Sequence, residues 1–231
     1  MSSKELTKEV KNTVVNNTEI GYGAEGVVYK IPQSDYCVKI FNGEGVNNLG
    51  EWDFNVSSQD KINHVVARAE NGSLIMKQIK GEALKWDKPD EIYDLPLKSY
   101  RDLLIQISNA GDECLQFDSV PSNLIYNKKD KTLTAIDFFE PNPDIDLEYN
   151  PLQAVFKCLH SSGRTPKDAE LNKKLGINLL TVVKDELQKK EPEFQIDRWD
   201  AEGLLYDIYI SQNFKIPKEI KQPEAEINKH F

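Results

Sequence analysis

Three polar residues in the middle of the chain have the types and spacing that phosphoryl transfer requires. Asp118 and Asn123 lie five positions apart in FDSVPSNLIY, and Asp137 follows in TAIDFF. Phosphoryl transfer needs a carboxylate that accepts or orients the attacking hydroxyl, and oxygen ligands that hold Mg²⁺ against the triphosphate. We expect Asp118 to be the base, and Asn123 and Asp137 to be the metal ligands.

A glycine-rich segment near the start of the chain could bring bare backbone close to phosphates. Gly21, Gly23 and Gly26 form GxGxxG, a pattern that is weak evidence when it stands alone. In a dinucleotide-binding fold the pattern would open a helix, whereas here Val27 and Val28 continue as a strand. We therefore expect a hairpin turn that binds nucleotide, with Val28 beside the ligand; a hairpin with no ligand is the alternative.

A lysine on the next predicted strand is a candidate ligand for the phosphates. Lys39 lies in CVKI between apolar residues, where an unpaired ammonium is costly, so it needs an anionic partner. Nucleotide phosphates and a carboxylate from a following helix would supply one, and Glu51 is the best placed acid. Asp53 and Glu44 are near, and Glu51 could equally lie on a solvated helix face. Lys39 could also extend to solvent from an edge strand.

A chance match to any one of these motifs is common, and Asp118 to Pro121 could be a plain turn. Their order along the chain is much rarer. GYGAEGVVYK, CVKI, LIMKQIKGEAL, FDSVPSNLIY and AIDFFEP together resemble the protein-kinase superfamily, over roughly residues 19–141. The resemblance implies ATP and Mg²⁺ or Mn²⁺ as cofactors, with Lys39, Asp118, Asn123 and Asp137 as catalytic residues. It also implies Met76 as gatekeeper, and Lys77 to Ile79 as the hinge whose backbone meets adenine.

The resemblance extends, by architecture more than by sequence, to the minimal bacterial effector kinases of the OspG and NleH group. Those kinases resemble this chain in their compact N-lobe and in lacking a long activation segment. The resemblance implies transfer of the γ-phosphoryl group of ATP to a protein Ser or Thr hydroxyl. It also implies a protein substrate or activating partner, and either a cytoplasmic location or secretion into a host cytosol.

Four positions depart from the kinase pattern and bear on turnover. Gln116 and Phe117 stand where the family has His-Arg, Val120 replaces a lysine that contacts the transferring phosphate, and Phe139 replaces the glycine of Asp-Phe-Gly. A pseudokinase scaffold that binds nucleotide and a partner protein is therefore one alternative. A small-molecule phosphotransferase is another, disfavoured by the small C-terminal part.

Composition limits the classes of partner. The chain has 231 residues, 39% of them hydrophobic, and a formal net charge of −9, which disfavours nucleic acid. We expect no signal peptide, because the N-terminus lacks an apolar core, and no membrane span, because no run of about 18 apolar residues occurs. Three widely spaced cysteines indicate buried thiols. The three tryptophans are expected in the core or at lobe contacts.

Hydrophobic periodicity predicts an α+β protein that is sheet-rich at first and helical later. The resemblance implies a two-lobed kinase-like fold, in which a compact, sheet-rich N-lobe precedes a reduced helical C-lobe. We expect a flexible leader over residues 1–17, the N-lobe over 18–80, the C-lobe over 81–216 and a polar tail over 217–231. Strands are predicted around the glycines, at CVKIF, at HVVARA and at SLIMKQI, with a helix over 49–62. A helix from Leu97 to near Gly111, a hairpin over 124–139 and three later helices complete the prediction.

Overall fold

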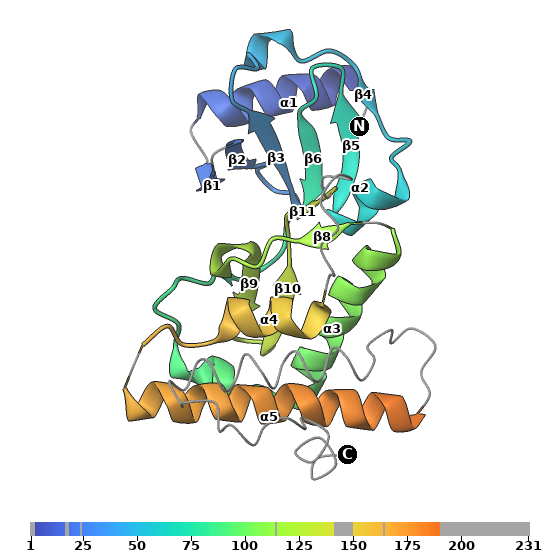
Figure 1. Ribbon diagram of the computed structural model, residues 1–231. Coiled ribbons are helices and arrows are strands. Elements are labelled where there is room, and N and C mark those ends of the chain that lie inside the picture. Colours follow the sequence, from blue (N-terminus) through green and yellow to red (C-terminus); the bar gives the residue numbers. More distant parts are fainter. Residues whose placement is uncertain are drawn as a thin grey trace. The chain divides into compact units, whose positions relative to one another are not determined.

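The computed structural model describes residues 3–16, 19–23, 25–113, 115–140, 150–163 and 165–189. The chain divides into two compact units, residues 1–79 and residues 80–231 (Figure 1). This division falls one residue before the boundary predicted from the sequence. Antiparallel strands dominate the first unit and helices come later in the chain, so the protein belongs to the α+β class.

The first unit is built on an antiparallel sheet whose strand order is β1-β2-β3-β6-β5-β4. The strands are β1 (Glu19–Tyr22), β2 (Gly26–Lys30), β3 (Tyr36–Phe41), β4 (Trp52–Asp53), β5 (Val65–Ala69) and β6 (Leu74–Lys77). Alternating β-branched and apolar residues form these strands, and Gly72, with a φ of 89°, supplies the left-handed turn between β5 and β6. The strands predicted around the glycines, at CVKIF, at HVVARA and at SLIMKQI are confirmed.

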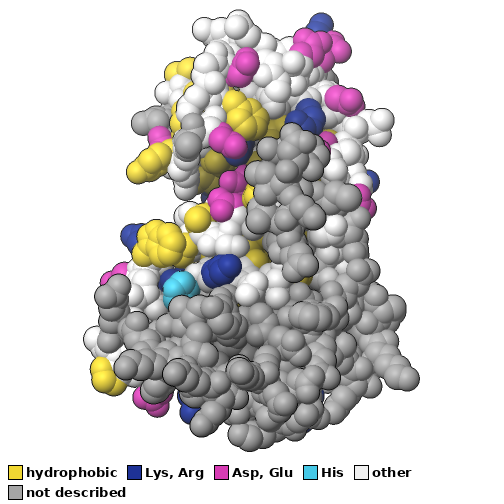
Figure 2. Space-filling model, in the orientation of Figure 1, with side chains coloured by type: hydrophobic (Ala, Val, Ile, Leu, Met, Phe, Trp, Pro, Cys, Tyr) yellow, Lys and Arg dark blue, Asp and Glu magenta, His cyan; other side chains and the backbone are white. Residues whose placement is uncertain are grey.

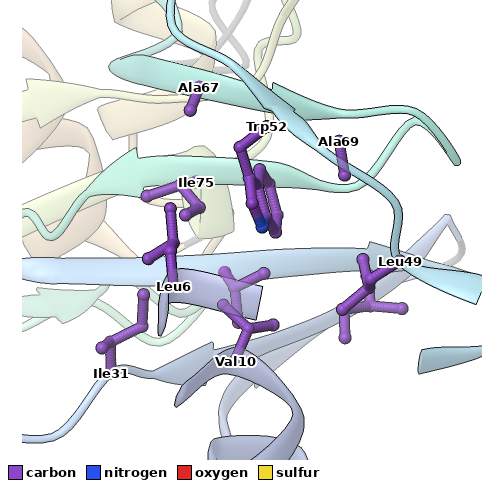
Figure 3. Packing of buried hydrophobic residues seen from close by; sticks show 10 residues of the cluster. Leu6, Val10, Ile31, Leu49, Trp52, Ala67, Ala69 and Ile75 are labelled. Atoms are coloured by element: carbon purple, nitrogen blue, oxygen red, sulfur yellow. The ribbon is translucent and has the colours of Figure 1, made fainter. Parts of the chain in front are cut away.

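Helix α1 (Ser3–Val15) covers one face of this sheet. Leu6 and Val10, one helical turn apart, join a buried cluster with strand residues including Val38, Ile75 and Trp52 (Figure 3). Burying these apolar side chains stabilises the helix against the sheet, at about 25 cal/mol per Å² of apolar surface. The sequence-based expectation of a flexible leader over residues 1–17 therefore differs from the structure, because residues 3–15 are helical and packed.

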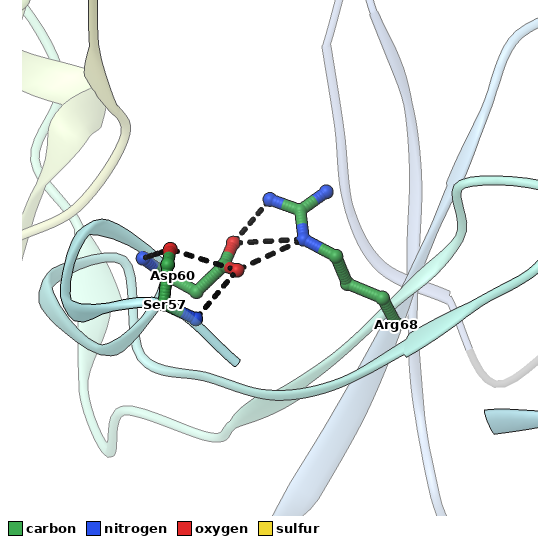
Figure 4. A network of polar contacts seen from close by, with 3 residues as sticks. All are labelled: Ser57, Asp60 and Arg68. Carbon is green, nitrogen blue, oxygen red and sulfur yellow. Dashed lines mark hydrogen bonds and ion pairs between the residues drawn. The ribbon is translucent and has the colours of Figure 1, made fainter. Parts of the chain in front are cut away.

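The helix predicted over residues 49–62 is wrong for most of its length. The structure has a 3₁₀ turn η1 (Val46–Asn48), then the edge strand β4, and a helix only in α2 (Ser58–Ile62). The Ser57 hydroxyl caps α2 by accepting a hydrogen bond from the backbone N–H of Asp60, and the Asp60 carboxylate accepts one from the backbone N–H of Ser57. Arg68 on β5 also pairs with Asp60 (Figure 4), so α2 is fixed to the sheet.

The second unit combines helices with two small sheets. Among the described residues, its helices are the 3₁₀ segments η2 (Asp90–Asp94) and η3 (Pro121–Asn123), and α3 (Leu97–Asp112), α4 (Pro151–Leu159) and α5 (Pro166–Lys189). One sheet has the order β10 (Thr132–Ala135), β9 (Leu124–Asn127), β7 (Glu82–Ala83), and the other pairs β11 (Phe138–Phe139) with β8 (Gln116–Phe117). The predicted helix ending near Gly111 is confirmed, and the hairpin predicted over 124–139 is confirmed as β9 and β10, whereas Phe138 and Phe139 form β11.

The core of the second unit lies along α3. Leu103, Leu104 and Ile107 are fully buried at helical spacing, and α3 contacts α4, α5 and β10. Two buried tyrosines satisfy their hydroxyls within this unit: Tyr93 donates to the carbonyl of Leu159 at 3.0 Å, and Tyr100 donates to that of Ile92. Buried polar groups need such partners, so these contacts fix η2 against α3 and α4.

Several smaller predictions can be compared with the described residues. Cys37, Cys158 and Trp52 are buried as expected, whereas Trp86 is 61% exposed, so the expectation of a core or lobe-contact role is not met there. Cys114, Trp199, the last predicted helix and the polar tail lie outside the described residues. No helix in the described part of the chain is long and apolar enough to cross a membrane.

Candidate active site

One face of the first sheet gathers residues that the sequence assigned to nucleotide binding. Val38 and Ile40 point to the α1 side, so alternation along β3 places Lys39 on the opposite face. Val28 on β2 is the cross-strand partner of Lys39, and residues paired in this way share a face. Met76 on β6 is paired with Cys37, so it lies on that face too.

The Lys39 ammonium lies against the glycine-rich turn. Its Nζ is 3.0 Å from a carboxylate oxygen of Glu25, and it stands over the Phe41 ring at 5.1 Å from the centroid. The Lys39 side chain is only 18% exposed, whereas that of Glu25 is 66% exposed. The largely buried ammonium of Lys39 is therefore paired with a carboxylate that is well solvated. Because a solvated ion pair contributes little free energy, another anion could replace Glu25 at low cost.

Glu51 does not pair with Lys39, which corrects the expected helix acid. Glu51 lies before the edge strand β4, not on a helix, and its side chain is exposed. Two strands, β6 and β5, separate β4 from β3. At about 4.8 Å between neighbouring strands, the backbones of β3 and β4 are roughly 14 Å apart. The acid that the sequence interpretation missed is Glu25, which lies inside GYGAEG at a position that GxGxxG leaves unspecified.

The glycine-rich segment forms the β1–β2 hairpin, so a helix does not follow it. The three glycines have different reasons to be glycine. A Cβ on Gly26 would lie 2.3 Å from the carbonyl oxygen of Ile40, so the close β2–β3 contact requires glycine there. A Cβ on Gly23 would meet nothing within 4 Å, and one on Gly21 would only touch Val28. Packing among the described residues thus accounts for Gly26 alone.

The predicted hinge follows β6 directly. The backbone N–H of Lys77 donates to His64 at 2.8 Å, and that of Gln78 donates to Asp35 at 2.8 Å. Ile79 has no hydrogen-bond partner among the described residues and is half-buried. Among the three hinge N–H groups, that of Ile79 is the one that remains available to a ligand.

In the second unit the structure brings Asp118 and Asn123 into contact. The Asn123 side-chain amide donates to the Asp118 carboxylate and to its backbone carbonyl, both at 3.2 Å. Val120 donates its N–H to the carbonyl of Asp118 at 2.7 Å, and Pro121 starts the short turn η3 that carries Asn123. The loop therefore holds an exposed carboxylate beside a buried amide.

Asp137 joins this pair through two backbone connections. Phe117 and Phe138 are cross-strand partners in β8 and β11, so Asp118 and Asp137 directly extend the same pair of strands. The two rings also contact each other, with centroids 5.7 Å apart. In addition, Ile136, which precedes Asp137, donates its N–H to the carbonyl of Asn123 at 2.8 Å. All three predicted catalytic residues of this unit thus lie close together.

The oxygen atoms of this cluster suit a hard cation such as Mg²⁺. Because the Asn123 amide nitrogen donates to Asp118, its Oδ1 is left without a partner among the described residues. Asp137 is exposed, with a φ of 65° in the left-handed region, which aspartate tolerates better than most residues and which often marks functional sites. The described residues contain no group of three or more His, Cys, Asp and Glu side chains suited to a metal. One amide and one carboxylate oxygen would leave most Mg²⁺ positions to phosphates and water.

Comparison with models of protein families gives no match, and comparison with the sequences of curated proteins gives none either.

A glutamine outside every motif positions the strand that leads to Asp137. Gln106 on α3 donates to the carbonyl of Ala135 at 2.8 Å and accepts from the N–H of the same residue at 2.9 Å. This bidentate contact takes the place of a neighbouring strand at the edge of β10. Gln106 lies among apolar residues of an amphipathic helix. A polar side chain in such a position needs a hydrogen-bond partner, and this need is the sequence signal that could have identified Gln106.

Figure 2 shows the described surface on one side of the molecule. Basic, acidic and hydrophobic side chains are interspersed there, and the coloured part of this view has no extended patch of one charge. The chain as a whole is acidic.

Proposed function

We propose that the chain is an ATP-dependent protein kinase with a reduced two-lobed kinase-like fold. In this proposal residues 1–79 are the N-lobe that binds adenine and phosphates, and the following unit is the C-lobe that holds the metal and the acceptor hydroxyl. The observation that carries the proposal is the convergence of Asp118, Asn123 and Asp137, three residues that sequence spacing alone had selected.

The contacts of the first unit support nucleotide binding. Lys39, Val28 and Met76 share one face of the sheet, and Lys39 has an exchangeable anionic partner in Glu25. The N–H of Ile79 would bind adenine, and the turn at Gly23 leaves room for phosphates near the backbone. Together these features support the binding of one ligand, ATP.

The second unit supports the chemistry. The hydroxyl oxygen of the acceptor forms a bond to the γ-phosphorus as the bond from that phosphorus to the β,γ-bridging oxygen breaks, and ADP leaves. Asp118 accepts the hydroxyl proton. Asn123 Oδ1 and the Asp137 carboxylate would hold Mg²⁺, which supplies charge neutralisation for the phosphates. The hydrogen bond from Asn123 orients Asp118 toward the acceptor.

A pseudokinase is the second candidate, and Val120 is the observation that favours it. The family's lysine at this position places a positive charge on the transferring phosphate, and an apolar side chain removes it. Val120 is half-buried in the catalytic loop, and its backbone takes part in the turn at Asp118. In that role the chain would bind nucleotide and a partner protein without turnover.

The kinase proposal is tested by incubating the protein with γ-labelled ATP, Mg²⁺ or Mn²⁺ and a cell lysate. Asp118→Asn and Asp137→Asn should each lower transfer by about 100-fold or more. Asp130→Asn, which changes an exposed carboxylate in the β9–β10 turn, is the matched control and should transfer normally. Equal transfer by all variants would exclude the catalytic assignment. Absence of transfer with an ATP-induced rise in melting temperature would favour the pseudokinase.

A further inference from the structure

The segment after β7 runs beside the loop that carries Asp118 and Asn123. Strand β7 pairs antiparallel with β9, and Leu84 donates its N–H to the carbonyl of Leu124 at 2.9 Å. Leu124 directly follows Asn123. Because the two chains run in opposite directions, the residues after Leu84 continue toward the residues before Leu124. Residues 85–88 are thereby brought to the side of the catalytic loop.

Lys88, at the end of this stretch, is a partly buried cation with a neutral partner. Its ammonium donates to the backbone carbonyl of His160 at 2.9 Å and lies 5.7 Å from the centroid of the Trp86 ring. Burial lowers the pKa of Lys88. No carboxylate of the described residues lies within ion-pair distance of Lys88. An ammonium in this environment gains from an additional anionic ligand.

The charges of Lys88 and Asp118 both act on Cys158, a residue of helix α4. The helix ends at His160, whose carbonyl holds Lys88, and Cys158 lies fully buried two residues earlier. Burial raises the pKa of the Cys158 thiol to about 12, the charge of Lys88 lowers it, and that of Asp118 raises it. Both ionic groups therefore belong to the electrostatic environment of this thiol. This agrees with the path of the backbone from β7.

Trp86 adds an aromatic surface to the same place. Its side chain is 61% exposed, and the Lys88 ammonium lies over its ring. Exposed tryptophans are uncommon, and they are enriched where a protein recognises a partner. A basic group and an aromatic ring on the segment that runs beside the loop of Asp118 are suited to a peptide that carries negative charge close to the reacting hydroxyl.

We propose that Lys88 and Trp86 form a subsite for an anionic group of the acceptor protein, so that the chain selects hydroxyls flanked by acidic or phosphorylated residues. The role of the subsite in selecting acceptors rests on the proposed kinase function, whereas its binding of an anionic peptide does not require phosphate transfer. The ammonium of Lys88 contacts the anionic oxygens, and the Trp86 ring packs on the peptide backbone. Lys88, Trp86 and the loop of Asp118 all belong to the second unit.

The test measures binding and transfer separately, with three fluorescent Ser-containing peptides. These carry Asp, phosphoserine or Ala around the acceptor serine, and affinity is read by fluorescence anisotropy in the presence of Mg²⁺ and a non-hydrolysable ATP analogue. Wild type should bind at least one anionic peptide about tenfold tighter than the Ala peptide. A preference for the Asp peptide identifies carboxylates as the ligand, and a preference for phosphoserine identifies a primed substrate.

Three variants complete the test. Lys88→Met should remove the preference and raise KM for the anionic peptide about tenfold while kcat changes less than about twofold. Lys88→Arg should retain the preference because it keeps the charge. Lys85→Met is the matched control, an exposed lysine on the same segment, and should behave as wild type. Unchanged ATP-induced thermal shifts will show that each variant is folded.

The outcomes that overturn the subsite differ from those that overturn the kinase proposal. Equal binding of all three peptides by wild type, or an equal loss in Lys85→Met and Lys88→Met, excludes the subsite even if transfer occurs. A fall in kcat at constant KM in Lys88→Met also excludes it, since Lys88 would then contact the transferring phosphoryl group. Selective binding without any transfer would retain the subsite and exclude the kinase.

Discussion

The side-chain amide of Asn123 donates a hydrogen bond to the carboxylate of Asp118 at 3.2 Å. This contact uses the amide nitrogen and leaves the amide oxygen as the proposed Mg²⁺ ligand. The backbone carbonyl of the same residue accepts from Ile136, next to Asp137. A single buried residue therefore connects the proposed base with the proposed metal-binding carboxylate.

The partner of Lys39 can be identified by nucleotide affinity. Lys39→Met should weaken ATP binding by about tenfold or more, because the phosphates lose their cation. Glu51→Gln should leave the Kd for ATP within about twofold. Glu25→Gln should tighten ATP binding by about two- to fivefold, since the exposed ion pair that phosphates displace is worth less than about 1 kcal/mol. Isothermal titration calorimetry measures all three. A large loss in Glu51→Gln alone would restore the original assignment.

The glycines of the hairpin should separate stability from affinity. Gly26→Ala places a Cβ against the backbone of Ile40 and should lower the free energy of unfolding by about 1–3 kcal/mol. Gly23→Ala meets no atom within 4 Å and should change stability by less than about 1 kcal/mol. If phosphates approach this backbone, Gly23→Ala should still weaken ATP binding severalfold. Urea unfolding and calorimetry provide the two readouts, and an unchanged Kd would exclude phosphate contact at Gly23.

Gln106 should act as a positioning residue for Asp137. Gln106→Leu removes two hydrogen bonds to Ala135 and should cost about 1–3 kcal/mol of stability. It should also raise the Mg²⁺ concentration needed for half-maximal transfer, while metal-free ATP affinity stays constant. Asn109→Ala, on the exposed side of the same helix, is the control. A stability loss with an unchanged Mg²⁺ requirement would reduce Gln106 to a structural role.

The ion pair of Asp60 and Arg68 should give the protein an acid-sensitive component of stability. The hydrogen bond from Arg68 is the largest of the effects that lower the pKa of Asp60, so the unfolded state binds more protons in acid. The stabilisation is complete above about pH 5, where an unfolded aspartate with a pKa of about 3.9 is almost fully ionised, and it is lost as the pH falls through the depressed folded pKa. Asp60→Asn should cost about 1–3 kcal/mol at pH 7.

The pH dependence distinguishes this ion pair from simple packing. In urea unfolding followed by circular dichroism, the difference between wild type and Asp60→Asn should shrink as the pH is lowered from 5 toward 2.5. A difference that stays constant over that range would show that the Asp60 charge does not contribute.

The elements that positioned the candidate site could largely be predicted, because their signals are local. Alternating residues predicted the strand of Lys39, turn residues predicted the β9–β10 hairpin, and amphipathic spacing predicted α3. The spacing of Asp118, Asn123 and Asp137 selected residues that prove to be neighbours. Short-range pattern was sufficient because η3 and a single hairpin connect all three.

The errors arose where tertiary contacts override local pattern. Trp52 is buried against α1 from an edge strand, which splits the region predicted as one helix over 49–62. Ser57 and Asp60, three residues apart, are a capping signal that would have placed the helix start. Leu6 and Val10 show helical spacing, but their burial depends on the sheet they cover. The pairing of Lys39 with Glu25 depends on the register between β2 and β3, which places Gly26 opposite Phe41 and which residue types alone do not specify.

The central claim is that this chain binds ATP through a metal ion held by Asn123 and Asp137. Isothermal titration calorimetry of ATP with and without Mg²⁺ tests it most directly. Wild type should bind ATP with a Kd that improves about tenfold or more when Mg²⁺ is present, and Asp137→Asn should lose that improvement while keeping metal-free binding. No binding by wild type, or the same Mg²⁺ dependence in Asp137→Asn, would contradict the account.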